Sequence, residues 1–193
     1  MPQLIQRILE SKPGSASRQA GLFLWQLDDQ SRRLGEDTRR ATVAELTWQP
    51  RPGMNTIGML LAHIAAVEVG WMRAAVHRTD RDSVQVLGIS KREIGMPLAP
   101  GALGPEALAD RELSWFDALL ARAREHTRAA VAPLTDADLE RRFRTPASWE
   151  PGGTEFEGTI GWALYHILEH EAGHYGQINL LRHQYRALAS DRD

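Results

Sequence analysis

The chain has 193 residues, of which 42% are hydrophobic, and its 23 Lys and Arg residues nearly balance 25 Asp and Glu residues. The formal net charge of −2 lacks the basic excess of nucleic-acid-binding domains, so we expect no nucleic-acid partner. The sequence has no cysteine, which excludes disulfides, thiolate metal sites and a cysteine nucleophile. Any metal would therefore be bound through nitrogen and oxygen atoms.

No stretch approaches 18 uncharged apolar residues, so we expect no membrane-spanning segment. Residues 1–14 lack the long apolar core and the small-residue cleavage site of a signal peptide. Both observations favour a cytoplasmic protein. The length suits a single domain over residues 1–193, with its core at about 17–188.

The first half of the chain has a helical pattern of apolar residues. A short amphipathic segment at 4–9 precedes a break at Pro13 and Gly14. A first long helix is predicted at 17–34, with Ser15 or Ser17 as its cap. The connection at 39–53 contains a helical turn at 43–46 and ends at two prolines.

A second long helix is predicted from Asn55, its expected N-cap, to about His77. The segment at 79–105 is rich in Gly and Pro, so we interpret it as a long connection with one helical turn at 90–94. A third long helix is predicted at 105–131.

The last part of the chain contains a capped short helix at 135–139, a loop or short hairpin at 144–158, and a fourth long helix at 159–188. Residues 190–193 are polar and are expected to fray. The predicted fold is all-α: a four-helix bundle with long crossing connections and short extra helices.

Three histidines at a repeat of four are the most informative feature of the fourth helix. Residues four apart share one face of a helix, so two imidazoles at that spacing can bind one metal ion. Helical-wheel positions put His174 inside the apolar stripe, His170 on its shoulder and His166 about a quarter-turn away. His170 and His174 are thus the predicted ligand pair. A solvated helix that is simply rich in histidine explains such a pair about equally well.

A functional divalent site usually needs a third protein ligand and keeps one position open. His63 on the second helix is the leading candidate, because it also lies on the shoulder of an apolar stripe. From the pattern alone, a histidine bonded to a backbone carbonyl is the commoner explanation for such a position.

Glu68 and Glu171 lie near or inside the apolar stripes of the second and fourth helices. A buried carboxylate is costly unless it is paired or coordinated. Either one is a candidate general base, and Glu68 could also fix the tautomer of a ligand histidine. The alternative is an ion pair with an arginine, for which Arg73 and Arg182 are the candidates.

The other histidines are expected at the surface and most tryptophans in the core. Surface positions are predicted for His77, His126 and His183. Core positions are predicted for Trp25, Trp71, Trp115 and Trp162, whereas Trp48 and Trp149 lie in connections.

Two sequence blocks together resemble the DinB/YfiT-like superfamily. The first is the segment at 54–63, ending in His63, with Glu68 and Trp71 after it. The second is the run of three histidines followed by Gly176, Gln177 and Ile178. The resemblance spans roughly 19–186. It implies a four-helix bundle that holds a divalent metal through three histidines at one end, and it suggests a homodimer.

Carried over by motif, the resemblance makes His63, His170 and His174 the metal ligands, with His166 as an alternative ligand. Zn²⁺ or Ni²⁺ suits imidazole, and iron is possible. The iron-binding domain of ergothioneine-forming enzymes has a similar histidine set but a Glu at the position of Gly176. That difference weakens an iron-dependent interpretation of this kind.

Some members of the family use thiols, such as mycothiol-dependent maleylpyruvate isomerase and the bacillithiol transferases. We therefore expect a metal-dependent transferase that activates a low-molecular-weight thiol for transfer to a small electrophilic substrate. One alternative is a hydrolase with metal-bound water, in which Glu68 or Glu171 is the general base. Another is a non-catalytic bundle that binds metal or a partner.

Overall fold

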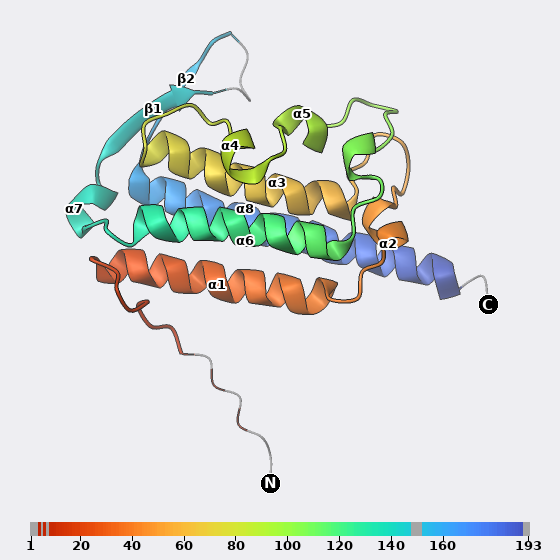
Figure 1. Ribbon diagram of the computed structural model, residues 1–193, viewed down its shortest axis with the longest axis horizontal. Coiled ribbons are helices and arrows are strands. Elements are labelled where there is room, and N and C mark those ends of the chain that lie inside the picture. The colour runs from red at the N-terminus through yellow and green to blue at the C-terminus, as the bar shows by residue number, and fades with distance from the viewer. Residues whose placement is uncertain (1–3, 5, 7, 148–151, 191–193) are drawn as a thin grey trace.

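Four long helices lie side by side along the molecule in the computed structural model (Figure 1), which describes residues 4, 6, 8–147 and 152–190. They are α1 (Arg18–Thr38), α3 (Ile57–Ala75), α6 (Leu113–Val131) and α8 (Ile160–Ser190). The predicted all-α four-helix bundle is confirmed. The helix α3 packs against both α6 and α8, and α1 packs on α8 and α6.

The long helices do not simply alternate in direction. In Figure 1, α3 and α6 run one way along the bundle, and α1 and α8 run the other way. The chain between α3 and α6 must therefore return along the bundle before α6 begins. This return is the long crossing connection that the Gly- and Pro-rich sequence predicted.

Short helices decorate the connections. They are α2 (Val43–Thr47), α4 (Val84–Leu87), α5 (Lys91–Ile94), the 3₁₀ helix η1 (Glu106–Leu108) and α7 (Asp136–Leu139). The turns predicted at 43–46, 90–94 and 135–139 are present, whereas α4 was not predicted. In α5 and α7, a Ser or Thr cap and an acidic residue three positions later satisfy each other's backbone N–H groups.

Several predicted helix boundaries are wrong. Thr56 rather than Asn55 caps α3, because its Oγ1 accepts a hydrogen bond from the Met59 N–H. The third long helix begins at Leu113 instead of 105, since the chain between forms η1 and a turn. The first helix is capped by Ser17 as predicted but continues four residues beyond Leu34.

The N-terminal segment and two tryptophans also differ from expectation. The predicted amphipathic segment at 4–9 lies partly outside the described residues, and its described residues are not helical. Trp25 and Trp115 are only half-buried, because the outer faces of α1 and α6 meet solvent. Trp149 lies outside the described residues. Trp71 is fully buried as predicted, and Trp162 is partly buried against the core.

The segment predicted as a loop or short hairpin is an antiparallel hairpin. Its strands are β1 (Arg142–Pro146) and β2 (Glu155–Thr159), paired with Phe143 opposite Gly158. The strand β2 leads directly into α8, and Thr159 Oγ1 accepts a hydrogen bond from the Trp162 N–H at the first turn. The hairpin therefore covers the end of the bundle at which α8 begins.

The helix α3 is the central element of the core. Sixteen of its 19 residues are buried, and His63 is one of the three that are not. By length and composition α3 could cross a membrane, but 89% of its most apolar window is buried inside the bundle. That burial is typical of a core helix.

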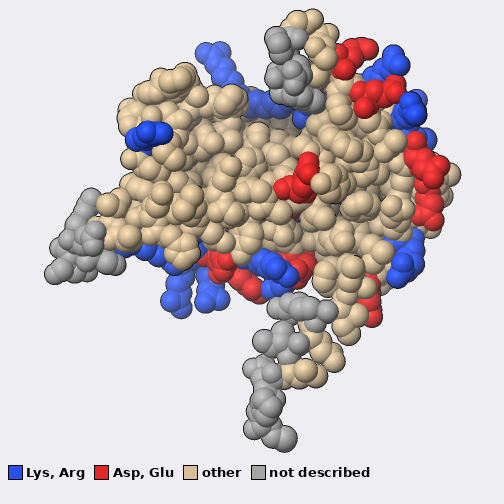
Figure 2. Space-filling model, turned by 180° about the vertical axis from the view of Figure 1, so that it is seen from behind, with Lys and Arg blue, Asp and Glu red and all other residues tan. Residues whose placement is uncertain are grey.

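Figure 2 shows that charged side chains of both signs gather at the hairpin end of the face seen from behind.

A buried arginine joins all four long helices, because Arg124 of α6 contacts carboxylates on the other three, including Asp28 of α1 at 3.4 Å. Arg124 of α6 donates from Nε and Nη2 to the two carboxylate oxygens of Glu68 on α3, at 2.9 and 3.2 Å. The same Nη2 lies 3.0 Å from Glu171 on α8, whose other oxygen accepts a hydrogen bond from Ser31 on α1. The two carboxylate side chains are only 2% and 1% exposed.

The charges in this network shift one another's ionisation. Burial by itself lowers the pKa of the Arg124 guanidinium. The two glutamates have the larger combined effect and raise that pKa above the ordinary value of arginine. Burial raises the pKa of Glu171 to about 6, although the charge of Arg124 acts in the opposite direction. The alternative prediction, that an arginine pairs with each glutamate, is thus confirmed, but the arginine is Arg124 and not Arg73 or Arg182. Arg73 instead binds Asp80, and Arg182 binds Glu45.

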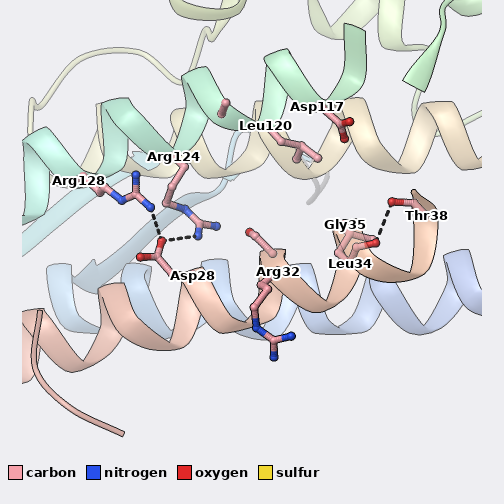
Figure 3. Close-up of a pocket in the computed structure, with 11 residues that line it drawn as sticks. Asp28, Arg32, Leu34, Gly35, Thr38, Asp117, Leu120, Arg124 and Arg128 are labelled. Atoms are coloured by element: carbon pink, nitrogen blue, oxygen red, sulfur yellow. Dashed lines mark hydrogen bonds and ion pairs between the residues drawn. The ribbon is translucent and has the colours of Figure 1, made fainter. Parts of the chain in front are cut away.

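The same network borders a cavity of about 430 Å³ between α1 and α6. In Figure 3, Arg124 and Arg128 from α6 point toward Asp28 on α1, while Arg32 points away. Arg128 Nη2 lies 2.7 Å from Asp28 Oδ1, so the cationic groups of this cavity already have carboxylate partners. No histidine is among the described residues that line it. We therefore do not regard it as the functional site.

Replacing Arg124 with Met should destabilise the fold strongly. The substitution leaves the carboxylates of Glu68 and Glu171 buried without their cation, which costs about 3–5 kcal/mol in comparable cases. Arg128→Met is the matched control, because Arg128 is 55% exposed and its ion pair contributes no more than about 1 kcal/mol. Urea unfolding measures both free energies. Equal stabilities for the two variants would contradict the role assigned to Arg124.

Candidate metal centre

The structure brings together the three histidines predicted as metal ligands. His63 comes from α3, and His170 and His174 lie one turn apart on α8. Nε2 of His170 lies 3.1 Å from Nε2 of His63 and 3.0 Å from Nε2 of His174. The three candidate ligand atoms all lie within 4.8 Å of one another. A nitrogen from an early helix thus meets two nitrogens from the last one.

These separations match those of nitrogens that share a metal ion. At a zinc–nitrogen distance of about 2.1 Å, two ligands in tetrahedral geometry lie roughly 3.4 Å apart. The structure holds two of the nitrogen pairs at 3.0 and 3.1 Å, so small side-chain shifts are sufficient to admit an ion. A single Nε2 of His170 faces two other ring nitrogens, and one N–H cannot satisfy both of them equally. A cation between the three rings removes this conflict.

The protonation state of the site suits metal binding. Burial, followed by the charges of His174, Lys91 and Arg81, lowers the pKa of His63 to about 4. Burial and the neighbouring histidines lower the pKa of His170 to about 2. Both imidazoles are therefore neutral near pH 7, and a neutral imidazole has a lone pair available for a metal.

The tautomer of His174 is set by a neighbour on its own helix. Nδ1 of His174 lies 2.8 Å from Oε1 of Gln177, and an amide oxygen only accepts hydrogen bonds. Nδ1 consequently carries the proton, and Nε2 is left as the ligand atom. Ligand histidines in metal sites are commonly oriented in this way. The sequence pattern had placed Gln177 in the motif without assigning it this contact.

A cavity of about 510 Å³ opens beside two of the three histidines, His63 and His170. Its other walls come from α3, from the segment after α3, from the hairpin and from α8. The residues that complete the lining are Val67, Trp71, Arg81, Phe156, Trp162, His166 and Glu169. The site thus combines a cluster of metal-ligand type with space for a small molecule.

A family model described as the DinB superfamily matches residues 26–178, which is most of the chain. The chain belongs to the DinB superfamily. The resemblance inferred from the two histidine blocks is therefore confirmed.

One solved structure extends the comparison to the fold. It is a crystal structure of a conserved protein of locus from Enterococcus faecalis, with a TM-score of 0.58 and 19% sequence identity. The match covers 83% of this chain and 93% of the other. At that identity the likeness shows a shared fold alone. No curated protein matches the chain.

In this DinB protein, His166 lies beside the histidine cluster and is not part of it. Its ring stacks in parallel on Trp162, with 4.9 Å between centroids and 6° between planes. Nδ1 of His166 lies 2.9 Å from Glu169 Oε1. The cluster of potential ligands in the described part of the chain comprises His63, His170 and His174. His166 instead forms part of the cavity wall.

The glutamates proposed as general bases lie elsewhere. Glu68 and Glu171 are bound to Arg124 inside the bundle, and neither is among the described residues that line the cavity. The acidic residue at the cavity is Glu169, which the sequence analysis did not single out. Arg81 was also missed, because a lone arginine in a Gly- and Pro-rich connection carries no recognisable signal.

The remaining histidines are mostly as expected. His77 and His183 are exposed, as predicted. His126 is half-buried rather than exposed, with its ring 5.2 Å from that of His77. The predicted homodimer stays a prediction, and exposed Tyr165 and Leu180 on α8 offer apolar surface for it.

Metal analysis of purified variants tests the ligand set. We expect about one divalent ion per wild-type chain after zinc loading and desalting, and substoichiometric metal in His63→Ala, His170→Ala and His174→Ala, because two imidazoles bind much more weakly than three. His183→Ala is the control, since His183 is exposed on the same helix as two of the ligands. Elemental mass spectrometry gives the stoichiometry. Full occupancy in His174→Ala would contradict the assignment.

Proposed function

We propose that this protein is a metal-dependent transferase that activates a low-molecular-weight thiol for attack on a small electrophilic substrate. One observation supports the proposal above all: three ring nitrogens lie together, and two of these histidines, His63 and His170, line a cavity of about 510 Å³. Membership of the DinB superfamily and the three-histidine cluster support metal binding itself. The thiol and the transfer reaction are the proposed part.

The donor set suits this chemistry. His63, His170 and His174 would hold the ion, with Zn²⁺ or Ni²⁺ as the expected metals. Three neutral ligands leave the ion's full charge in place, and a bound ion of this kind lowers the pKa of a thiol and favours its thiolate. Gln177 would keep the Nε2 of His174 available as a ligand by accepting the hydrogen bond from its Nδ1.

The absence of cysteine is consistent with a nucleophile that comes from a bound small molecule. The chain has no thiol of its own, so a thiolate at this site must come from a bound small molecule. A free thiol with a pKa near 8.5 is only about 3% ionised at pH 7. Ionisation at the metal would therefore raise the nucleophile's concentration on the order of 30-fold, apart from any gain from orientation.

Hydrolysis by metal-bound water is less well supported. That alternative depended on Glu68 or Glu171 as the general base. Both carboxylates are committed to Arg124, at 2.9 and 3.0 Å, away from the lining of the cavity. The thiol reaction needs neither of them.

Cobalt substitution tests thiol binding directly. In the Co²⁺-loaded protein, 2-mercaptoethanol should produce a near-ultraviolet thiolate-to-cobalt charge-transfer band, whereas ethylene glycol should not. The protein itself contributes no thiolate-to-cobalt band, because the chain has no cysteine. Metal loading is measured separately on the same sample.

The control is His183→Ala, which should show the band at wild-type strength. A protein that binds one Co²⁺ but shows no band with 2-mercaptoethanol or with glutathione would contradict thiol activation. The same protein with stoichiometric metal would still be a metal-binding DinB protein.

A further inference from the structure

Three apolar side chains in the lining of the cavity beside the histidines are only partly buried. Val67 of α3, Phe156 of β2 and Trp162 of α8 pack on the core and also line this cavity. They come from three elements that meet where the hairpin covers the end of the bundle. Apolar surface that still meets water beside a cavity gains free energy when an apolar ligand removes that water.

The aromatic rings of this lining do not form a flat slot. The planes of Trp71 and Trp162 stand at 74° to each other, and those of Phe156 and Trp162 at 40°. The guanidinium carbon of Arg81 lies 3.9 Å from the centroid of the Trp71 ring and covers it. The cavity of about 510 Å³ is therefore an irregular corner, which suits a compact ligand.

Gly158 of β2 lets two of these side chains pack closely. A Cβ atom at this position would lie 2.7 Å from Cε1 of Phe156 and 3.4 Å from Cε3 of Trp162. Without a side chain there, the two rings approach to 4.6 Å between centroids. His166 stacks on the Trp162 ring with 6° between the planes. These contacts fix both rings before a ligand arrives, which reduces the entropy that binding must overcome.

Most polar groups of the lining already contact one another. Nε2 of His63 and Nε2 of His170 lie 3.1 Å apart, at the candidate metal position. Nδ1 of His166 lies 2.9 Å from Oε1 of Glu169, to which Tyr165 also donates a hydrogen bond. Away from the metal position, a ligand would therefore have to replace an existing contact to form a hydrogen bond with these side chains.

The charged groups of the lining do not select a charged ligand. Arg81 lies over the Trp71 ring and has further interactions within the protein. Glu169 has the opposite charge, so the formal charges of these two lining residues cancel. Lys91 is near enough for Arg81 to lower its pKa, after burial, but it is not among the described residues that line the cavity. A charged ligand would lose hydration here without gaining a free partner.

We propose that this cavity binds a compact, uncharged apolar group, and that Val67, Phe156 and Trp162 form its binding surface. The assignment deepens the proposed function and rests on it in one respect: the ligand would be the electrophile that accepts the thiol. The substrate would then be a neutral molecule rather than an organic acid or an amine. Binding of the apolar group needs no metal, since the three side chains belong to the chain.

Three probes with the same ring and different head groups test the preferred charge of the ligand. Cyclohexylmethanol is neutral, cyclohexanecarboxylate is an anion, and cyclohexylmethylamine is a cation at neutral pH. Isothermal titration and tryptophan fluorescence measure the binding of each probe to the full chain after chelator has removed any metal. We expect the neutral probe to bind about 10-fold more tightly than either ion, because only the ions lose hydration without a partner.

Two variants test the binding surface. Val67→Asn should weaken cyclohexylmethanol binding about 3- to 10-fold, because it puts an amide into the apolar wall. Val86→Asn is the matched control and should leave the affinity within about twofold. Val86 lies on α4, is partly buried like Val67, and is not among the described residues that line the cavity. Phe156→Ala should weaken binding further, since it removes a whole ring from the contact. Thermal melts check that each variant is folded.

Three results would overturn the assignment. The first is that either ion binds the metal-free protein as tightly as cyclohexylmethanol or more tightly. The second is wild-type affinity for cyclohexylmethanol in both folded variants, Val67→Asn and Phe156→Ala. The third is no measurable binding of cyclohexylmethanol at its solubility limit. Because these measurements use metal-free protein, failure of thiol activation in the cobalt experiment would leave this result standing, and the reverse also holds.

Discussion

The guanidinium of Arg124 binds a carboxylate from each of the two helices that carry the histidines. Glu68 lies on α3, five residues after His63, and Glu171 lies on α8 between His170 and His174. The ion pairs are buried, so a change in the relative position of α3 and α8 would break them at high cost. The arginine therefore constrains the same helix pair whose spacing sets the distances among the three ring nitrogens.

The proposed function rests on the residues that this constraint holds together. Two of the three clustered imidazoles, His63 and His170, have strongly lowered pKa values and line a cavity to which Trp71, Phe156 and Trp162 also contribute. The hairpin closes the end of the bundle and contributes Phe156 to that cavity. The candidate metal ligands thus lie beside a cavity of about 510 Å³, which is the arrangement that the proposed function needs. In the proposed reaction the nucleophile is a bound thiol, because the chain has no cysteine of its own.

Much of this arrangement could be predicted from the sequence, because it follows from local periodicity. The repeat of four put His170 and His174 on one helical face, and apolar stripes revealed the burial of Glu68 and Glu171. Arg124 could not be identified, since its partners are far away in the sequence and any of several arginines could pair with a glutamate. The predicted start of the third long helix at 105 was wrong for a related reason. A helical pattern of apolar residues does not show where a turn interrupts it. The position of Arg81 at the cavity depends on the path of a loop, and the spacing of apolar residues does not predict that path.

The most direct test of the central claim is an anomalous-scattering map of the zinc-loaded crystal. We predict one strong peak on each chain, about 2.0–2.1 Å from the Nε2 atoms of His63, His170 and His174, with a further coordination position facing the cavity. A peak that lacks His63, or an ion closed off by a fourth protein ligand, would contradict an open three-histidine centre shared between α3 and α8.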